Sequence, residues 1–293
     1  MTTRNEDDRA TPAPGSPPQS GWRWYLVLNV LHLDAPLITV VWQALFARSV
    51  GYELLLAERL ALFLAVWIVY AGDRVLDGYR LSIGPTTAAR HRFSRRHSRS
   101  LIRLIATAIL AEVALAFFLP LHVLLGGATL GLVVVGYFLW NQLAGTRFGR
   151  GWSKEVVVSL VFAGGAALVP LVQAFSWPLL AEVLGFAAVC YANCLLIARL
   201  ERDRDRDRGE RSIAGHLRPD ARPSQPLTAF LATVLTLALI ILGPNVVGVT
   251  LLASVLLLAL APLIEDRCGR DATAAWADLA LLTPICTLAF GVA

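Results

Sequence analysis

The strongest constraint in this sequence is its series of uncharged apolar segments, each about 20 residues long, which is the length that a helix needs to cross a bilayer. Apolar residues make up 56% of the 293 residues and charged residues only 16%, too few to cover a water-soluble chain of this length. Backbone groups inside a bilayer need hydrogen bonds within their own segment, which favours helices. The sequence therefore predicts an all-α polytopic membrane protein.

Breaks at Pro and Gly divide the apolar sequence into about nine predicted transmembrane helices. They cover residues 24–47, 54–79, 100–119, 121–142, 153–175, 177–200, 226–243, 245–264 and 273–291. Several of the breaks are short, which implies that consecutive helices run antiparallel.

The basic residues give an orientation. Of the 26 Lys and Arg residues, all but Arg48 and Arg59 lie in the N-terminal segment, or in the connections that follow an even-numbered helix and the helix ends beside them. Cytoplasmic loops carry the excess of Lys and Arg. We therefore expect a cytoplasmic N-terminus, an external C-terminus and a location in the bacterial inner membrane.

The remaining composition narrows the class further. Residues 1–22 are polar and rich in Pro, Ser and Thr, so we expect a disordered cytoplasmic segment before one transmembrane domain at 23–293, with no signal peptide. The net charge of +5 is carried by the loops, which favours contact with membrane lipid and argues against nucleic acid. The four cysteines form no CxxC pair and are interpreted as apolar packing residues.

Two pairs of carboxylates are the leading candidates for a site. Asp73 and Asp77 close the second predicted helix, and Glu201 and Asp205 follow the sixth, so the predicted topology places both pairs at the cytoplasmic side. A spacing of four puts each pair on one helix face. Two alternatives stay open: an acidic helix end neutralised by neighbouring arginines, and a solvated zwitterionic loop formed by the Arg/Asp repeat at 202–208.

Four carboxylates that face one cavity would suit Mg²⁺, which proteins hold with a few carboxylates together with water and substrate phosphate oxygens. Arginines close to such a site could bind a diphosphate.

At these residues the sequence resembles the UbiA superfamily of intramembrane prenyltransferases, as a divergent member. The first motif of that family reads N-D-x-x-D-x-x-x-D, and Asp73 and Asp77 match its last two aspartates. The Asn and the first Asp are replaced by Val69 and Tyr70.

The second family motif, D-x-x-x-D followed by Gly and Ser/Thr, is matched by Glu201, Asp205, Gly209 and Ser212. The resemblance implies nine helices around a central cavity. It also implies that Mg²⁺, held by the four carboxylates, serves the transfer of an isoprenyl group from an isoprenyl diphosphate to a lipophilic acceptor. An intramembrane terpene cyclase of the same superfamily and a non-catalytic or transport protein that retains the fold remain alternatives.

Other polar residues are candidates for the same site. Lys154, Arg147, Arg74 and Asn193 are expected to bind the diphosphate, although Lys154 could equally be an interfacial anchor paired with Glu155. Two further residues are expected to line the cavity: Asp34 and Tyr191. A structural ion pair for Asp34 and apolar packing for Tyr191 are their alternatives.

Overall fold

The computed structural model describes residues 31–80, 93, 95–143, 151–207, 224–243 and 245–290. The described residues are almost entirely helical. The helices are α2 (Asp34–Ser49), α3 (Leu56–Arg80), α5 (Ser98–Ala116), α6 (Leu121–Leu143), α7 (Gly151–Gln173), α8 (Trp177–Asp207), α9 (Ser224–Leu242), α10 (Val246–Ala259), α11 (Ala261–Cys268), α12 (Arg270–Leu279), η3 (Ala280–Leu282) and α13 (Pro284–Ala289).

Within the described ranges these helices form nine segments, as predicted, because α10 with α11 makes the eighth and α12 with η3 and α13 makes the ninth. In the part of the chain that the structure describes, four stretches are long and apolar enough to cross a membrane: Lys154–Gln173, Trp177–Leu200, Val246–Cys268 and Ala272–Ala289. Shorter apolar helices cover Leu121–Tyr137 and Gln225–Ile241. The all-α polytopic architecture is therefore confirmed.

The last two segments are not the continuous helices that the hydropathy predicts. The eighth breaks at Leu260, directly before a helix that carries Pro262 in its first turn. Gly269 then joins α11 to α12 with φ of 80°, a conformation that glycine adopts at little cost. The ninth segment changes to a 3-10 turn before Pro284. These breaks produce α11, a separate short helix beside the end of α8.

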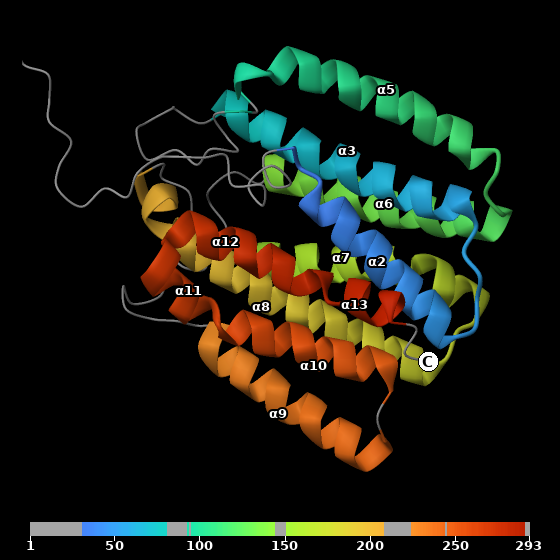
Figure 1. The fold of residues 1–293 in the computed structure, drawn as a ribbon. Helices are drawn as coiled ribbons and strands as arrows, with labels where there is room; N and C mark the ends of the chain where they lie inside the picture. The colour runs from blue at the N-terminus through green and yellow to red at the C-terminus, as the bar shows by residue number, and fades with distance from the viewer. Residues whose placement is uncertain are drawn as a thin grey trace, which may run out of the picture.

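Helix α2 lies at the centre of the bundle (Figure 1). It packs against α3 and α7 on one side and against α10, α12 and α13 on the other, so that the first helix described also contacts the last. The aromatic rings of Trp42 and Phe186 stack with their centroids 4.1 Å apart. This core joins α2 to α8.

A polar cluster formed by Tyr52, Glu58 and Gln173 connects three helices at one end of the bundle. Glu58, in the first turn of α3, is 1% exposed; its carboxylate accepts hydrogen bonds from the Tyr52 hydroxyl at 3.0 Å and the Leu55 amide at 2.9 Å. Gln173, at the end of α7, donates to the same hydroxyl at 3.1 Å. The connection between α2 and α3 is thereby tied to α7.

This cluster predicts a stability loss in the Glu58→Ala variant. The change leaves the Tyr52 hydroxyl and the Leu55 amide without their acceptor, which costs about 2 kcal/mol for bonds to a charged group. We expect a lower midpoint of thermal aggregation in detergent than for the wild type. Glu53→Ala is the matched control, because Glu53 is exposed in the same connection. Equal midpoints for Glu58→Ala and Glu53→Ala would contradict this role.

The cluster also has a pH dependence. Burial, followed by the hydrogen bond and the charge of Glu58, raises the pKa of Tyr52 above its ordinary value of 10.0. The folded state therefore favours the protonated phenol. The contribution of the protonated Tyr52 hydroxyl to the stability of the folded state is complete below pH 10, the ordinary pKa of tyrosine. It is lost as the pH rises through the higher pKa that Tyr52 has in the folded state.

Candidate functional site

Two contacts show which helix ends lie together. Gln173 at the end of α7 bonds Tyr52 in the connection between α2 and α3, so the start of α7 and the end of α3 both lie at the opposite end of the bundle. Ser159 of α7 contacts Cys194 of α8 (Oγ to Sγ, 3.9 Å), and the two helices run antiparallel. Helix α8 therefore ends where α7 begins. Figure 1 shows the ends of α3 and α8 on the same side, toward the left of the view. Both acidic pairs thus belong to one end of the molecule.

The first pair lies in the last two turns of α3. Asp73 is half-buried, and Asp77 lies one turn further along the same helix. The side chain of Asp77 lies outside the described part of the structure. The expected common helix face follows from the continuous helix through both positions.

Tyr70 stands at the position of the first aspartate of the family motif. Its ring lies edge-on to His32, with ring centroids 5.8 Å apart. The Arg74 guanidinium lies 5.0 Å from the centre of the Tyr70 ring, and Arg74 donates a 3.4 Å hydrogen bond to the Tyr70 hydroxyl. A neutral phenol beside a guanidinium thus replaces one carboxylate, which makes the first pair poorer in negative charge than the family motif. The predicted diphosphate contact of Arg74 stays a prediction.

The second pair lies in the last two turns of α8, which continues as one helix to Asp207. The side chains of Glu201 and Asp205 lie outside the described part, as do Arg147, Gly209 and Ser212 altogether. The helix bears on one of the two alternatives, because the Arg/Asp repeat up to Asp207 is helical and not a loop.

Lys154 lies near the second pair by helix register. Ser159 of α7 lies opposite Cys194 of α8, and the two helices are antiparallel. Lys154, five residues before Ser159, therefore lies at the level of Arg199, five residues after Cys194. Lys154 is exposed whereas its neighbour Glu155 is buried. The exposed amino group therefore lies level with the start of the second acidic pair.

Asn193 has a partner that the sequence did not suggest. It is 7% exposed, and its amide nitrogen donates to an Asp278 carboxylate oxygen of α12 at 3.3 Å. Tyr191, two residues before Asn193 in α8, is partly buried. Asn193 therefore contributes to a polar contact between α8 and α12, and its predicted diphosphate contact is untested.

Asp34 opens α2 and is 6% exposed. A negative charge in the first turn of a helix is stabilised by the helix dipole. Tyr70 of α3 meets His32, which lies just before α2. Because α2 and α3 are antiparallel, Asp34 lies deeper in the bundle than Tyr70 and therefore deeper than Asp73. Asp34 is thus buried beneath the first acidic pair.

The magnesium prediction rests on the helix positions. Among the described residues no group of three His, Cys, Asp or Glu side chains could hold a metal ion. Three of the four predicted ligands have side chains outside that set. The backbone does fit the prediction, since two helices each present an acidic pair, one turn apart, at the same end of the bundle.

Comparison with known proteins bears on the fold. Scans against models of protein families and against curated proteins find no match. Among solved structures, the chain is similar to the apo structure of a UbiA homolog from Aeropyrum pernix K1. The TM-score is 0.63 at 18% sequence identity, and the match covers 88% of this chain and 98% of that chain.

The chain is thus a polytopic α-helical membrane protein. More particularly, it has the fold of a UbiA homolog, which confirms the fold that the sequence predicts. A shared fold at this identity leaves the reaction to be argued from the site.

Proposed function

We propose that the protein transfers an isoprenyl group from an isoprenyl diphosphate to a lipophilic acceptor within the membrane, in a Mg²⁺-dependent reaction. The observation that carries the proposal is the presence of two acidic pairs at one end of the bundle, on α3 and α8, in the fold of a UbiA homolog. One acidic helix end is common, whereas two at the same end are much less expected by chance.

Each residue has a role in this proposal. Asp73, Asp77, Glu201 and Asp205 would hold Mg²⁺, which neutralises charge on the departing diphosphate. Lys154 and Arg74 would bind the diphosphate oxygens from α7 and α3. The apolar helices around the isoprenyl chain would keep water from the allylic carbon, so that the acceptor takes the isoprenyl group and the diphosphate leaves.

The test is release of inorganic diphosphate by purified protein in detergent. Geranyl, farnesyl and geranylgeranyl diphosphates are each supplied with Mg²⁺ or with EDTA, in the presence of an extract of membrane lipids as the source of acceptor. We expect Mg²⁺-dependent release with at least one donor and an isoprenylated lipid as product. A cyclised hydrocarbon without acceptor would favour the cyclase alternative. Absence of both release and Mg²⁺-dependent donor binding would contradict the enzyme.

Lys154 gives a matched pair of variants. Lys154→Gln removes the positive charge level with the second acidic pair, and we expect the KM for the donor to rise about tenfold, as for loss of one charged hydrogen bond. Lys154→Arg keeps the charge and should stay within threefold of the wild type. If both variants have the wild-type KM, Lys154 is an interfacial anchor and no ligand of the diphosphate.

A further inference from the structure

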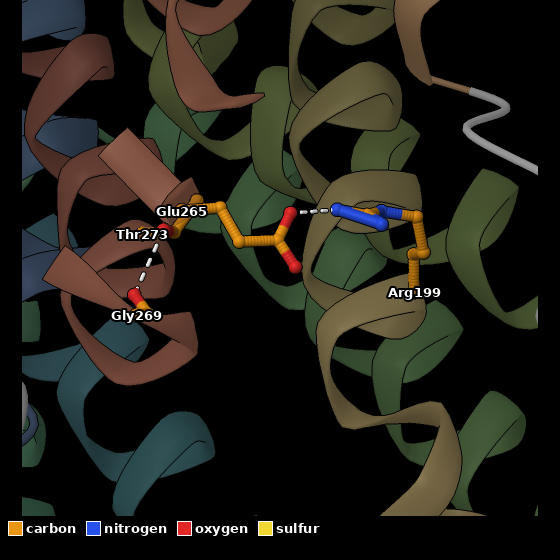
Figure 2. Close-up of polar contacts among 4 residues, drawn as sticks. All are labelled: Arg199, Glu265, Gly269 and Thr273. Atoms are coloured by element: carbon orange, nitrogen blue, oxygen red, sulfur yellow. Dashed lines mark hydrogen bonds and ion pairs between the residues drawn. The ribbon is translucent and has the colours of Figure 1, made fainter. Parts of the chain in front are cut away.

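An ion pair joins the end of α8 to the short helix α11. Arg199 Nη2 donates to Glu265 Oε2, and the two side chains are 15% and 17% exposed (Figure 2). The two residues are 66 positions apart in the sequence. The eighth segment therefore holds the helix that carries the second acidic pair.

Glu265 lies in the helix that follows the break in the eighth segment. Helix α11 begins at Ala261, after the break at Leu260, and ends at Cys268; the positive φ of Gly269 then turns the chain into α12. The Thr273 hydroxyl donates to the Gly269 carbonyl at 2.9 Å and fastens the turn (Figure 2). Glu265 is thus presented on a short, separately anchored helix beside Arg199.

Helix geometry relates this contact to the acidic pair. At 100° per residue, positions 201 and 205 lie about 200° and 240° around α8 from position 199. The ion pair therefore contacts the face of α8 opposite to the acidic pair. The Asn193–Asp278 hydrogen bond holds α8 six residues earlier. Beyond Arg199 the helix continues through the acidic pair to Asp207.

The position of Arg199 excludes a simpler role. Of the arginines around the second acidic pair, Arg199 is the one whose side chain the structure describes, and it faces α11 and not the side of the acids. The guanidinium is committed to Glu265, and burial of both groups makes the loss of one partner costly. Arg199 is therefore suited to fix the helix and not to bind the diphosphate.

We propose that Glu265, through its ion pair with Arg199, is a positioning residue that fixes the end of α8 and with it the Mg²⁺-binding geometry of Glu201 and Asp205. The consequence for the reaction rests on the function proposed above. The effect on the helix itself does not, so the two can be tested separately.

The first measurement is hydrogen exchange of backbone amides by mass spectrometry, on the full chain in detergent without substrate. In Glu265→Gln, amides of residues 201–207 should exchange about tenfold faster, because the helix end opens more often when its half-buried ion pair is lost. Amides of residues 180–192 should be unchanged. Asp266→Asn is the matched control, since Asp266 is exposed on the same helix and should leave both segments unchanged.

The double variant R199E/E265R restores the pair with reversed charges and should return exchange at residues 201–207 to near the wild-type rate. Recovery identifies the ion pair, and not the individual side chains, as the cause. Equal acceleration in both segments would show a general loss of stability, and unchanged exchange in Glu265→Gln would show that the pair does not hold the helix; either result overturns the proposal.

The second measurement is the Mg²⁺ dependence of diphosphate release. In Glu265→Gln we expect the half-saturating Mg²⁺ concentration to rise about tenfold, while the rate at saturating Mg²⁺ stays within threefold of the wild type. An unchanged Mg²⁺ requirement with accelerated exchange would overturn the catalytic consequence. If the wild-type protein neither releases diphosphate from any donor nor binds a donor in a Mg²⁺-dependent way, the proposed function fails, and the exchange result still decides whether Glu265 fixes α8.

Discussion

Conversion of Glu201 to Gln is expected to lower Mg²⁺-dependent diphosphate release by a factor of about a hundred or more, the loss typical when one charge-stabilising group is removed from a transition state. Glutamine has the same shape as glutamate and lacks the negative charge that a bound Mg²⁺ requires. Asp77→Asn should have a comparable effect, because it removes the corresponding charge from α3. Both positions lie in the last two turns of their helices, so both variants should retain wild-type thermal stability.

The matched control is Asp203→Asn. Asp203 lies between the two acids of the second pair, on the same helix, but 200° around it from Glu201. A charge that acts only as part of a solvated repeat would have the same effect at either position. We therefore expect Asp203→Asn to keep activity within about threefold of the wild type. Equal losses at positions 201 and 203 would contradict a specific metal site and favour a general effect of negative charge along the end of α8.

Mg²⁺ binding provides a readout besides turnover. Donor binding to the wild type, measured with a non-hydrolysable isoprenyl diphosphate analogue, should tighten when Mg²⁺ is added. In Glu201→Gln this effect of Mg²⁺ should be lost, while Mg²⁺-independent binding through Lys154 remains. A variant that retains the full Mg²⁺ effect would show that Glu201 is not a ligand.

The features that could be predicted from the sequence are those that depend on residues close together in the chain. Hydropathy predicted the nine segments, because each one must form its backbone hydrogen bonds within itself and be long enough to cross a bilayer. The spacing of four gave the two acidic pairs their helix faces, and the continuous α3 and α8 agree with it. The end of the bundle shared by both pairs followed from counting antiparallel helices.

The contacts between distant segments were not predictable in this way. Asn193 pairs with Asp278 across 85 residues, and Arg199 pairs with Glu265 across 66. Nothing in the local sequence distinguishes these residues from the other polar residues of the same helices. Pro262 and Gly269 are helix-breaking residues and were a sequence signal for the short helix α11. The continuous apolar sequence across Leu260 made this stretch resemble a single transmembrane helix instead.

Trp42→Ala is expected to cause the largest loss of stability, about 3 kcal/mol or more, as for removal of a fully buried aromatic side chain. Trp42 is 0% exposed at the centre of α2. Its removal would eliminate the stack on Phe186 and leave a cavity between α2 and α8. It would also leave the Leu281 carbonyl without the indole N–H that donates to it at 2.8 Å.

Two further variants separate these contributions. Trp42→Phe keeps an aromatic ring against Phe186 and loses the indole hydrogen bond, so about 1–2 kcal/mol should be lost. Trp177→Ala removes a tryptophan that is 74% exposed, and it should leave the midpoint of thermal aggregation near that of the wild type. The midpoint of thermal aggregation should therefore be highest for Trp177→Ala, lower for Trp42→Phe and lowest for Trp42→Ala. Helices inside a bilayer associate by close packing and not by exclusion of water, so the packing of Trp42 should matter more than that of an exposed tryptophan. A destabilisation by Trp42→Ala no larger than that by Trp177→Ala would show that the Trp42–Phe186 contact does not hold α2 at the centre of the bundle.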